Sequence, residues 1–205
     1  LTDSSAASDV YKRQVVLDGM QGGTAATQEV FIENVGQPTL ACIRPAVDAL
    51  QDLNSHREVQ LIISGGIRNG ADVAKALALG ADAVSIGSAA MIAIGDNDPK
   101  WEKEYEKLGT KAGAYDDWHE GNDPAGISTQ NPKLMKRLDP KKAGRKLSNY
   151  LKVMSLEAQT IARACGKNSL HNLEPEDLCA LTVEAAAMAR VPLAGTNWIP
   201  GIEKK

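Results

Sequence analysis

Three short apolar runs organise the first half of the chain. The run 59–63 is almost continuously apolar, which is typical of a parallel strand buried on both faces. The runs 15–17 and 83–86 are shorter, and each of the three runs is followed by a Gly-containing loop and a segment that suits a helix. Strands that alternate with short helices predict βαβ units, a parallel sheet and therefore an α/β fold.

Helices are predicted between and after these strands. A helix over about 71–79 ends at Gly80, which suits the left-handed residue that follows many helices. Another helix is predicted over 89–94, and 45–53 also suits a helix. Residues 25–35 could be helical as well.

The rest of the chain is predicted to be helical. The insert 96–107 is rich in charged residues, which predicts a solvated helix. Beyond it, apolar residues recur at helical spacing until Gly166, and Pro175 suits the first turn of a second helix that runs to about residue 190. We interpret 133–205 as a helical extension that forms core or subunit contacts. The recurring positions are Leu147, Leu151, Met154, Ala158, Ile161 and Cys165.

Composition narrows the class of protein. Of the 205 residues, 43% are hydrophobic and 24% are charged, as in an ordinary soluble globular protein. The net charge of −3 gives no indication of nucleic acid as a partner, and no apolar run approaches the ~20 residues that a membrane span needs. The cysteines are odd in number and far apart, which predicts reduced thiols and a cytoplasmic location.

The first fourteen residues differ in composition from the rest of the chain. The segment 1–14, LTDSSAASDVYKRQ, has no usable period, and we expect either translated adaptor sequence or a natural flexible terminus. The 205 residues also fall short of the ~250 of a complete (β/α)8 barrel. We therefore expect the protein to be cut upstream of Val15.

The loops after the second and third strands carry the clearest chemistry. A phosphate needs several N–H donors that converge on one point, and glycine lets the backbone approach without a Cβ in the way. Two such loops on consecutive strands match the phosphate site that barrels build after their seventh and eighth strands. The alternatives are that both loops are ordinary tight turns and that the arginine is a solvated surface cation. The residues predicted to form the phosphate site are Ser64, Gly65, Gly66, Arg68, Gly87 and Ser88.

Two stretches of sequence resemble known families. Residues 61–95, LIISGGIRNGADVAKALALGADAVSIGSAAMIAIG, resemble the closing units of several barrels that bind FMN or nucleotides. The loop 18–28 holds neither the nucleophilic cysteine of inosine-nucleotide dehydrogenases nor the His and Arg of 2-hydroxyacid oxidases. Instead DGMQGGTAAT resembles the DGGTGA-type loop of glutamate synthases, and PAGISTQNP at 124–132 resembles that family's PVGIATQDP segment.

The resemblance to glutamate synthases implies a fold and a cofactor. Residues 15–132 would form the C-terminal part of an FMN-binding (β/α)8 TIM barrel, about its last three strands, with the FMN phosphate in the Gly loops. No catalytic acid or base is assigned, because the family's candidates lie on strands that this chain lacks. As an alternative to a substrate role, Asp18 could simply cap its own loop. The loop implied to line the substrate side of the flavin comprises Asp18, Gln21, Gly22, Gly23 and Thr24.

The chain departs from the conventional family pattern at one point. Conventional glutamate synthases hold a 3Fe–4S cluster on three cysteines, and here Asp96, Trp118 and Asp123 stand at the corresponding positions. Thiolates are the usual protein ligands of such clusters, so no iron–sulfur cluster is expected. No metal site is predicted either, because no standard zinc spacing relates Cys165, His171 and Cys179.

The insert DNDPKWEKEYEKLG and the tail beyond residue 160 resemble one branch of the family, the flavin-binding subunit of N-methylglutamate synthase (methylamine–glutamate N-methyltransferase). That resemblance implies an enzyme that converts glutamate and methylamine to N-methylglutamate and ammonia. It also implies a hetero-oligomer with amidotransferase-like and GXGXG-type subunits. The alternatives are conventional glutamate synthase, which forms glutamate from 2-oxoglutarate, and a non-catalytic scaffold subunit. This chain alone is expected to be inactive.

Overall fold

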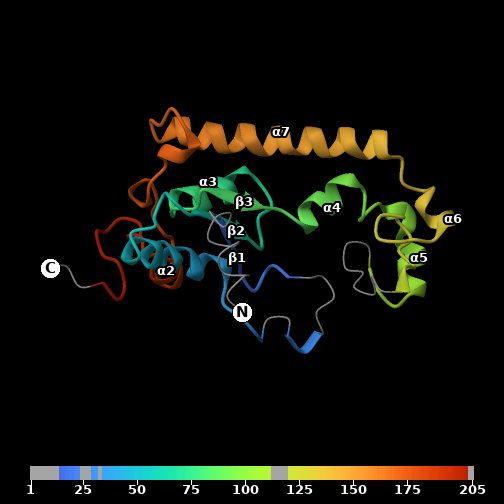
Figure 1. Cartoon of the computed structure of the whole chain (residues 1–205), viewed down its shortest axis with the longest axis horizontal. Coiled ribbons are helices and arrows are strands. Elements are labelled where there is room, and N and C mark those ends of the chain that lie inside the picture. Colours follow the sequence, from blue (N-terminus) through green and yellow to red (C-terminus); the bar gives the residue numbers. More distant parts are fainter. Residues whose placement is uncertain (1–13, 24–28, 32–33, 112–119, 203–205) are drawn as a thin grey trace, which may run out of the picture.

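A small parallel sheet lies at the centre of the first half of the chain. The computed structural model describes residues 14–23, 29–31, 34–111 and 120–202. Three parallel strands form the sheet in the order β1-β2-β3 (Figure 1), which confirms the predicted α/β fold and is compatible with part of a (β/α)8 barrel. The elements of this half are β1 (Gln14–Asp18), η1 (Glu29–Phe31), α2 (Thr39–Asp52), β2 (Gln60–Ser64), α3 (Gly70–Ala78), β3 (Ala83–Ser85) and α4 (Ser88–Ile94).

The two faces of the sheet are covered unequally. On one face Leu61 and Ile63 are 1% and 0% exposed and share a core cluster with Val47 of α2. On the other face lie Val16, which is 59% exposed, and Ile62, its neighbour in register. In a closed barrel this second face would look into the interior, so an uncovered face is compatible with part of a barrel.

The helix before β2 is longer than the sequence predicts. Residues 45–53 suit a helix that begins at Pro45, but α2 begins at Thr39 and contains Pro45 in its interior. Proline favours a first turn because it lacks an N–H, yet α2 begins six residues before Pro45, where Gln21 accepts from the amide of Thr39. Of the possible helix over 25–35, η1 is described, whereas 24–28 and 32–33 lie outside the described residues.

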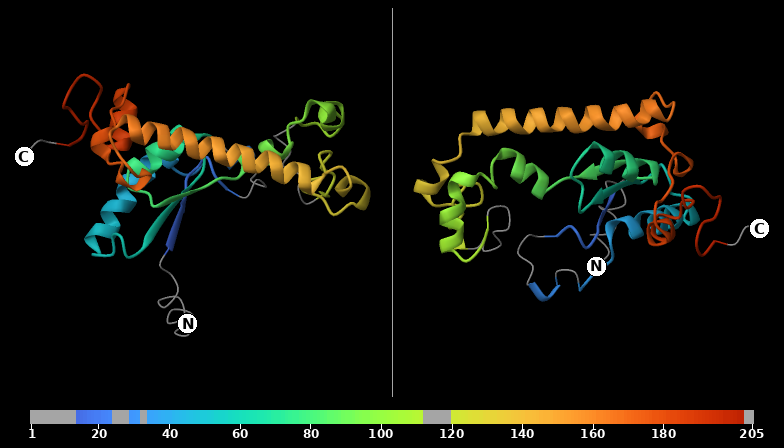
Figure 2. Two further views of the ribbon diagram at one scale, coloured as in Figure 1. Left: turned by 90° about the horizontal axis from the view of Figure 1, so that it is seen from above. Right: turned by 180° about the vertical axis from the view of Figure 1, so that it is seen from behind.

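The second half of the chain is dominated by one long helix, α7, which runs above α3 and α4 (Figures 1 and 2). Asp139 caps it by accepting hydrogen bonds from the amides of Lys141 and Lys142. No helix in the described ranges is long and apolar enough to cross a membrane. The elements of this half are η2 (Pro99–Trp101), α5 (Glu102–Lys107), α6 (Pro132–Met135), α7 (Pro140–Ala164), η4 (Leu170–Asn172), η5 (Pro175–Asp177) and α8 (Val183–Ala189).

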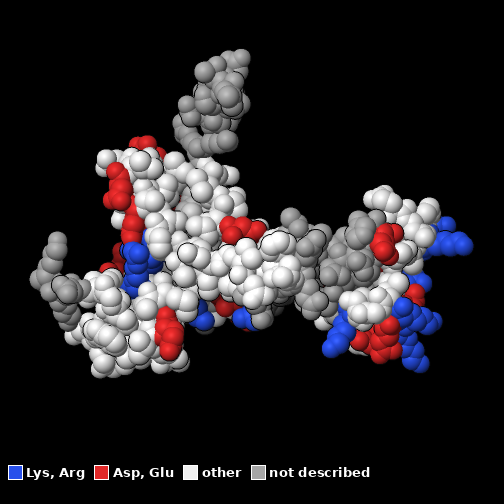
Figure 3. All heavy atoms as spheres, turned by 90° about the horizontal axis from the view of Figure 1, so that it is seen from below, with Lys and Arg blue, Asp and Glu red and all other residues white. Residues whose placement is uncertain are grey.

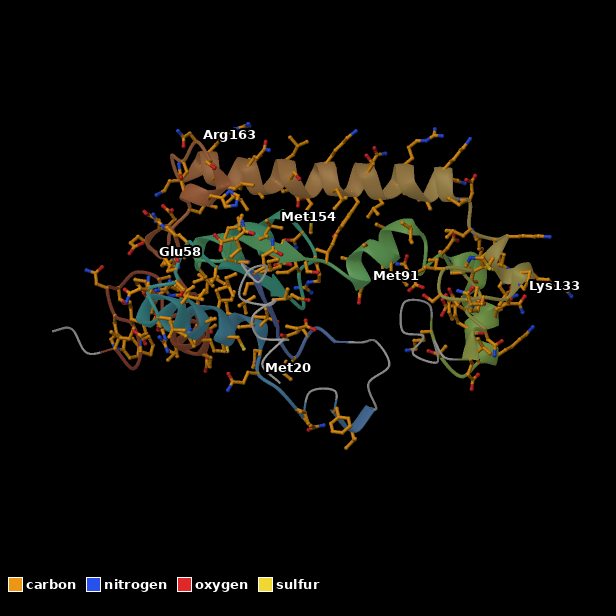
Figure 4. All side chains as sticks on the ribbon, viewed as in Figure 1. Met20, Glu58, Met91, Lys133, Met154 and Arg163 are labelled. Atoms are coloured by element: carbon orange, nitrogen blue, oxygen red, sulfur yellow. The ribbon has the colours of Figure 1, made fainter. Side chains whose placement is uncertain are left out.

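One face of α7 is core, as its apolar spacing predicts, and another is open. Met154 (Figure 4) and Ala158 are 6% and 0% exposed. Leu151 and Leu156, at 42% and 58% exposed, line a shallow groove of about 650 Å³ along the helix. The interpretation of this apolar face as core is confirmed for Met154 and Ala158. A role of the exposed positions in subunit contact stays a prediction.

The prediction of one continuous second C-terminal helix, from Pro175 to about residue 190, is wrong. The chain instead forms η5, an extended stretch in which Ala180 bridges to Leu193, and the separate helix α8. Thr182 starts α8 by accepting a hydrogen bond from the Ala185 amide. A new cap inside the predicted helix is the local reason for the break.

The first residue of α3, Gly70, lies against the backbone of α7. A Cβ built at Gly70 would lie 2.4 Å from the backbone oxygen of Met154, so the contact requires glycine. The Gly70 amide donates to Glu157 Oε2 at 2.9 Å, and the Tyr150 hydroxyl donates to the backbone oxygen of Arg68. These two hydrogen bonds connect α7 to the segment between β2 and α3.

We expect Gly70→Ala to destabilise the protein by about 1–3 kcal/mol, because the added methyl group overlaps backbone atoms that have no alternative rotamer. Gly144→Ala, on α7 itself, is the matched control. Nothing lies within 4 Å of a Cβ at Gly144, and alanine in a helix interior should stabilise by about 0.5–1 kcal/mol. Urea unfolding measures both changes. A Gly70→Ala variant as stable as the parent protein would contradict the close approach of α3 and α7.

Candidate functional site

The carboxyl ends of the three strands lie side by side. Asp18 pairs with Ser64, and Ser64 pairs with Ser85, so the last residues of β1, β2 and β3 are in register. The loops that follow therefore leave from one edge of the sheet, which is where parallel α/β folds carry their ligand sites. The two predicted phosphate loops and the predicted substrate-side loop all begin at this edge.

The loops after β1 and β2 are packed against each other. The Gly19 amide donates to the Ser64 backbone oxygen at 3.1 Å. Gly65 and Gly66 have φ angles of 102° and 77°, in the left-handed region that favours glycine. A Cβ on Gly65 would lie 2.8 Å from the Gly22 amide nitrogen, so a side chain there would push the two loops apart.

Unpaired backbone amides gather at the two predicted phosphate loops. Within the described part of the chain, the amides of Gly65, Gly66 and Ile67 have no acceptor outside the sheet ladder. The Ser88 amide lies in the first turn of α4, which has no side-chain cap, and nothing lies within 4 Å of a Cβ built on Gly87. Free amides beside open space can bind a phosphate group, so these residues fit the phosphate of FMN.

Arg68 is less closely tied to these amides. Its side chain is 78% exposed, and its Nε lies 3.6 Å from Asp72 Oδ2. Its backbone amide donates to the same oxygen at 3.0 Å. In this geometry Arg68 is a solvated cation beside Asp72, and its contact with a phosphate stays a prediction.

The predicted substrate-side loop has structural partners of its own. Gln21 Oε1 accepts hydrogen bonds from the amide and the hydroxyl of Thr39, at 2.8 and 2.9 Å, and so caps α2. A Cβ on Gly22 would lie 1.8 Å from Asp18 Oδ1, so the carboxylate of Asp18 lies over its own loop. This contact fits the alternative in which Asp18 organises that loop. Gly23 is described, with a φ of 129°, and Thr24 lies outside the described residues.

Three residues that support this site were not found from the sequence. Thr39 joins the two loops through Gln21, while Tyr150 and Glu157 hold the far end of the second loop. Tyr150 lies 82 positions from its partner, and no local pattern links the two.

The charged insert is less solvated than predicted. Charged side chains do gather on the outer surface at the α5–α6 end of the molecule (Figure 3). However, Tyr105 of α5 is 0% exposed and forms a small core with Ala125. The prediction of a simply solvated helix is therefore wrong. Trp101, Tyr105 and Leu108 recur at helical spacing within the insert, and this pattern indicated a buried face.

The positions that correspond to cluster ligands hold buried carboxyl groups. Asp96 is 4% exposed and Asp123 is 0% exposed. Both oxygens of Asp123 accept hydrogen bonds from the protein, so they are not free to bind iron. Trp118 lies outside the described residues. The described residues here do not fit a thiolate-bound iron–sulfur cluster. The cysteines lie elsewhere, on α2, just after α7 and just after η5, at Cys42, Cys165 and Cys179.

No metal site emerges from the described ranges. Among those residues, no group of three or more His, Cys, Asp and Glu side chains could hold a metal ion. His171 Nε2 lies 3.0 Å from the backbone oxygen of Asp82, which gives this histidine a structural partner.

Comparisons with known proteins agree on one family. The family model described as "Conserved region in glutamate synthase" matches residues 3–99 and 114–168. A glutamate synthase large subunit-like protein of Rhizobium meliloti is 83% identical over 187 residues, which are 91% of this chain and 42% of that protein. The archaeal glutamate synthase (NADPH) of Methanocaldococcus jannaschii is 40% identical over 159 residues, 78% of this chain and 28% of that protein.

The fold and the site define an α/β protein with Gly-rich loops at the carboxyl edge of a parallel sheet. The chain belongs to the glutamate synthase family, because the family model covers more than half of it. This confirms the resemblance to glutamate synthases, and N-methylglutamate synthase stays a prediction. The chain spans 42% of the Rhizobium relative and 28% of the archaeal one. The family match begins inside 1–14, whose origin also stays a prediction.

We expect Gln21→Ala to destabilise the protein by about 1 kcal/mol, as the loss of a helix cap does. Gln21→Glu is the matched control, because it keeps the oxygen that accepts from Thr39 and places negative charge at the start of α2. Thermal unfolding of both variants measures the effect. If Gln21→Ala unfolded like the parent protein, the cap would be unimportant and a role toward substrate would be favoured instead.

Proposed function

We propose that the chain supplies the phosphate-binding side of a flavin site in a cytoplasmic FMN-dependent enzyme of the glutamate synthase family. The observation that carries this proposal is the pair of neighbouring loops with unpaired amides, at Gly65–Ile67 and at Ser88, beside the open space at Gly87. Membership of the family supports flavin as the ligand, and the uncovered sheet face supports a larger barrel around it.

The chain's own residues would bind and orient the cofactor. Amides of the two loops would hold the FMN phosphate, and the first turn of α4 would add a favourable dipole end. The close packing of Gly65 on Gly22 fixes the distance between the phosphate loop and the loop that begins at Asp18. When bound, FMN supplies the hydride chemistry, while the protein supplies position and electrostatics.

For the reaction, we propose that glutamate and methylamine are converted to N-methylglutamate with release of ammonia. The sequence of the insert and the tail supports this branch, and so do the carboxyl groups of Asp96 and Asp123 at positions where conventional glutamate synthases use cluster cysteines. We further propose that the enzyme lacks an iron–sulfur cluster and works with amidotransferase-like and GXGXG-type subunits. Conventional glutamate synthase is the second candidate, favoured by the names of the relatives.

We expect Gly87→Ala in the assembled enzyme to lower FMN affinity about tenfold or more, because the new methyl group would occupy space that the phosphate needs. The fold should be unaffected, since no atom of the described residues lies within 4 Å of a Cβ built there. Gly144→Ala, which also meets nothing, should leave both fold and affinity unchanged. Flavin fluorescence titration measures the affinity. Unchanged affinity in Gly87→Ala would favour the alternative that this loop is an ordinary turn.

A second experiment separates the candidate reactions. The assembled enzyme is incubated with glutamate and methylamine, or with 2-oxoglutarate, glutamine and a reductant, and the products are identified by mass spectrometry. We expect N-methylglutamate from the first mixture. Glutamate from the second mixture alone would make conventional glutamate synthase the function. If neither mixture reacts and substrate does not reduce the flavin, a scaffold role is supported.

A further inference from the structure

Three polar side chains are buried together where α5 meets the loop before α6. Asp123 and Tyr105 are each 0% exposed, and Asp96, directly after α4 and Gly95, is 4% exposed. The hydroxyl of Tyr105 donates to Asp123 Oδ1 at 2.8 Å and lies 3.3 Å from the backbone oxygen of Asp96. The group therefore joins the end of α4, the insert and the loop that starts at Asp123.

Asp123 is fully satisfied as a carboxylate. Its Oδ1 accepts from the Ala125 amide at 2.9 Å in addition to Tyr105, and its Oδ2 accepts from the amides of Ile127 and Ser128 at 2.7 and 2.8 Å. A carboxylate, which only accepts, suits four donors, whereas a protonated carboxyl would place its own hydrogen against one of them. The geometry thus assigns a negative charge to Asp123.

Asp96 has the opposite surroundings. Its Oδ1 is buried and has no hydrogen-bond partner among the described residues. An ionised oxygen left without a donor in a buried site is strongly unfavourable, and the negative Asp123 nearby adds repulsion. Burial first, and then Asp123, raises the pKa of Asp96 above its ordinary value of 3.8, while the Tyr105 hydroxyl opposes this in part.

Among the described residues, no cation forms an ion pair with the side chain of Asp96. From α5, Glu104 forms an ion pair with Arg137 at 2.8 Å, and Arg137 also donates to the Pro124 backbone oxygen and stacks on Trp101. From α7, Lys146 Nζ approaches Gly95, at 3.7 Å from a Cβ built there. Arg137 is thus committed to other partners.

We propose that Asp96 and Asp123 form a proton-dependent latch, in which a neutral Asp96 and an ionised Asp123 close the insert onto the Asp123–Asn131 loop, and loss of the Asp96 proton opens it. The latch does not depend on bound flavin. At two positions that correspond to cluster cysteines of conventional glutamate synthases, this chain would have a hydrogen-bonded core whose closure depends on one proton. Because Asp96 directly follows Gly95 and its amide bonds to Met91 of α4, opening would begin at the end of that helix.

The direction of the pH dependence follows from the raised pKa. The folded latch holds its proton more tightly than the unfolded chain does, so its closure is most stable at low pH. That stability is lost as pH rises above 3.8 and through the raised value. Asp96→Asn mimics the neutral carboxyl and should remove the dependence. Asp123→Asn removes an acceptor from amides that need one and should open the latch at every pH.

The test is hydrogen exchange by mass spectrometry on the assembled enzyme, at a series of pH values corrected for the intrinsic exchange rate. The peptides followed cover 97–110 and 121–131. In the parent protein, we expect protection of both peptides to fall together as pH rises through the raised pKa of Asp96. In Asp96→Asn, protection should stay constant.

Glu106→Gln is the matched control, because this exposed acid of α5 should leave the parent profile unchanged. Equal pH profiles in the parent protein and Asp96→Asn would overturn the proposal, and so would loss of protection in Asp96→Asn at low pH. Should Asp123→Asn fail to fold, the comparison of the parent protein with Asp96→Asn still decides between these outcomes.

Discussion

Helix α7 meets the start of α3 at backbone level, and this contact holds the segment that follows β2. Gly70 lets the two backbones meet, with Met154 oxygen only 2.4 Å from where a side chain would begin. Two more hydrogen bonds, from Tyr150 of α7 and to Glu157 of α7, fix the segment between the predicted phosphate loop after β2 and α3. The other end of that loop packs on Gly22. A loop held at both ends presents its amides in one geometry, as a preorganised binding site requires.

The sheet explains why these loops meet at all. Its strands end in register at Asp18, Ser64 and Ser85, so segments far apart in sequence emerge side by side. On one face of the sheet, Leu61 and Ile63 of β2 pack against α2 and α3, whereas Val16 on the other face is 59% exposed. This arrangement is compatible with part of a (β/α)8 barrel, and the chain spans 42% of the Rhizobium relative.

Local patterns in the sequence predicted most of the strands and helices in the first half of the chain. The apolar run 59–63 and the stop at Gly80 predicted β2 and α3 closely, because burial and a left-handed glycine are local signals. The start of α2 was missed, since Gln21 caps it from another loop. The contacts of Tyr150 and Glu157 with the start of α3 could not be predicted, because their partners lie 82 and 87 positions away in the sequence. The burial of Asp96 has no local sequence signal either. Arg68 was predicted to bind phosphate because of its position in the loop. In the structure its side chain lies beside Asp72, with Nε 3.6 Å from Oδ2.

The cluster-free FMN site that we propose can be tested by analysing the assembled enzyme for cofactors, with visible absorption, mass spectrometry of the released flavin and iron determination on one sample. We expect FMN bound at the subunit that contains this chain, and no iron there in stoichiometric amount. Iron at about three atoms per flavin, as a 3Fe–4S cluster would give, would contradict the inference that Asp96 and Asp123 stand in place of cluster cysteines. Absence of flavin would contradict the phosphate site itself.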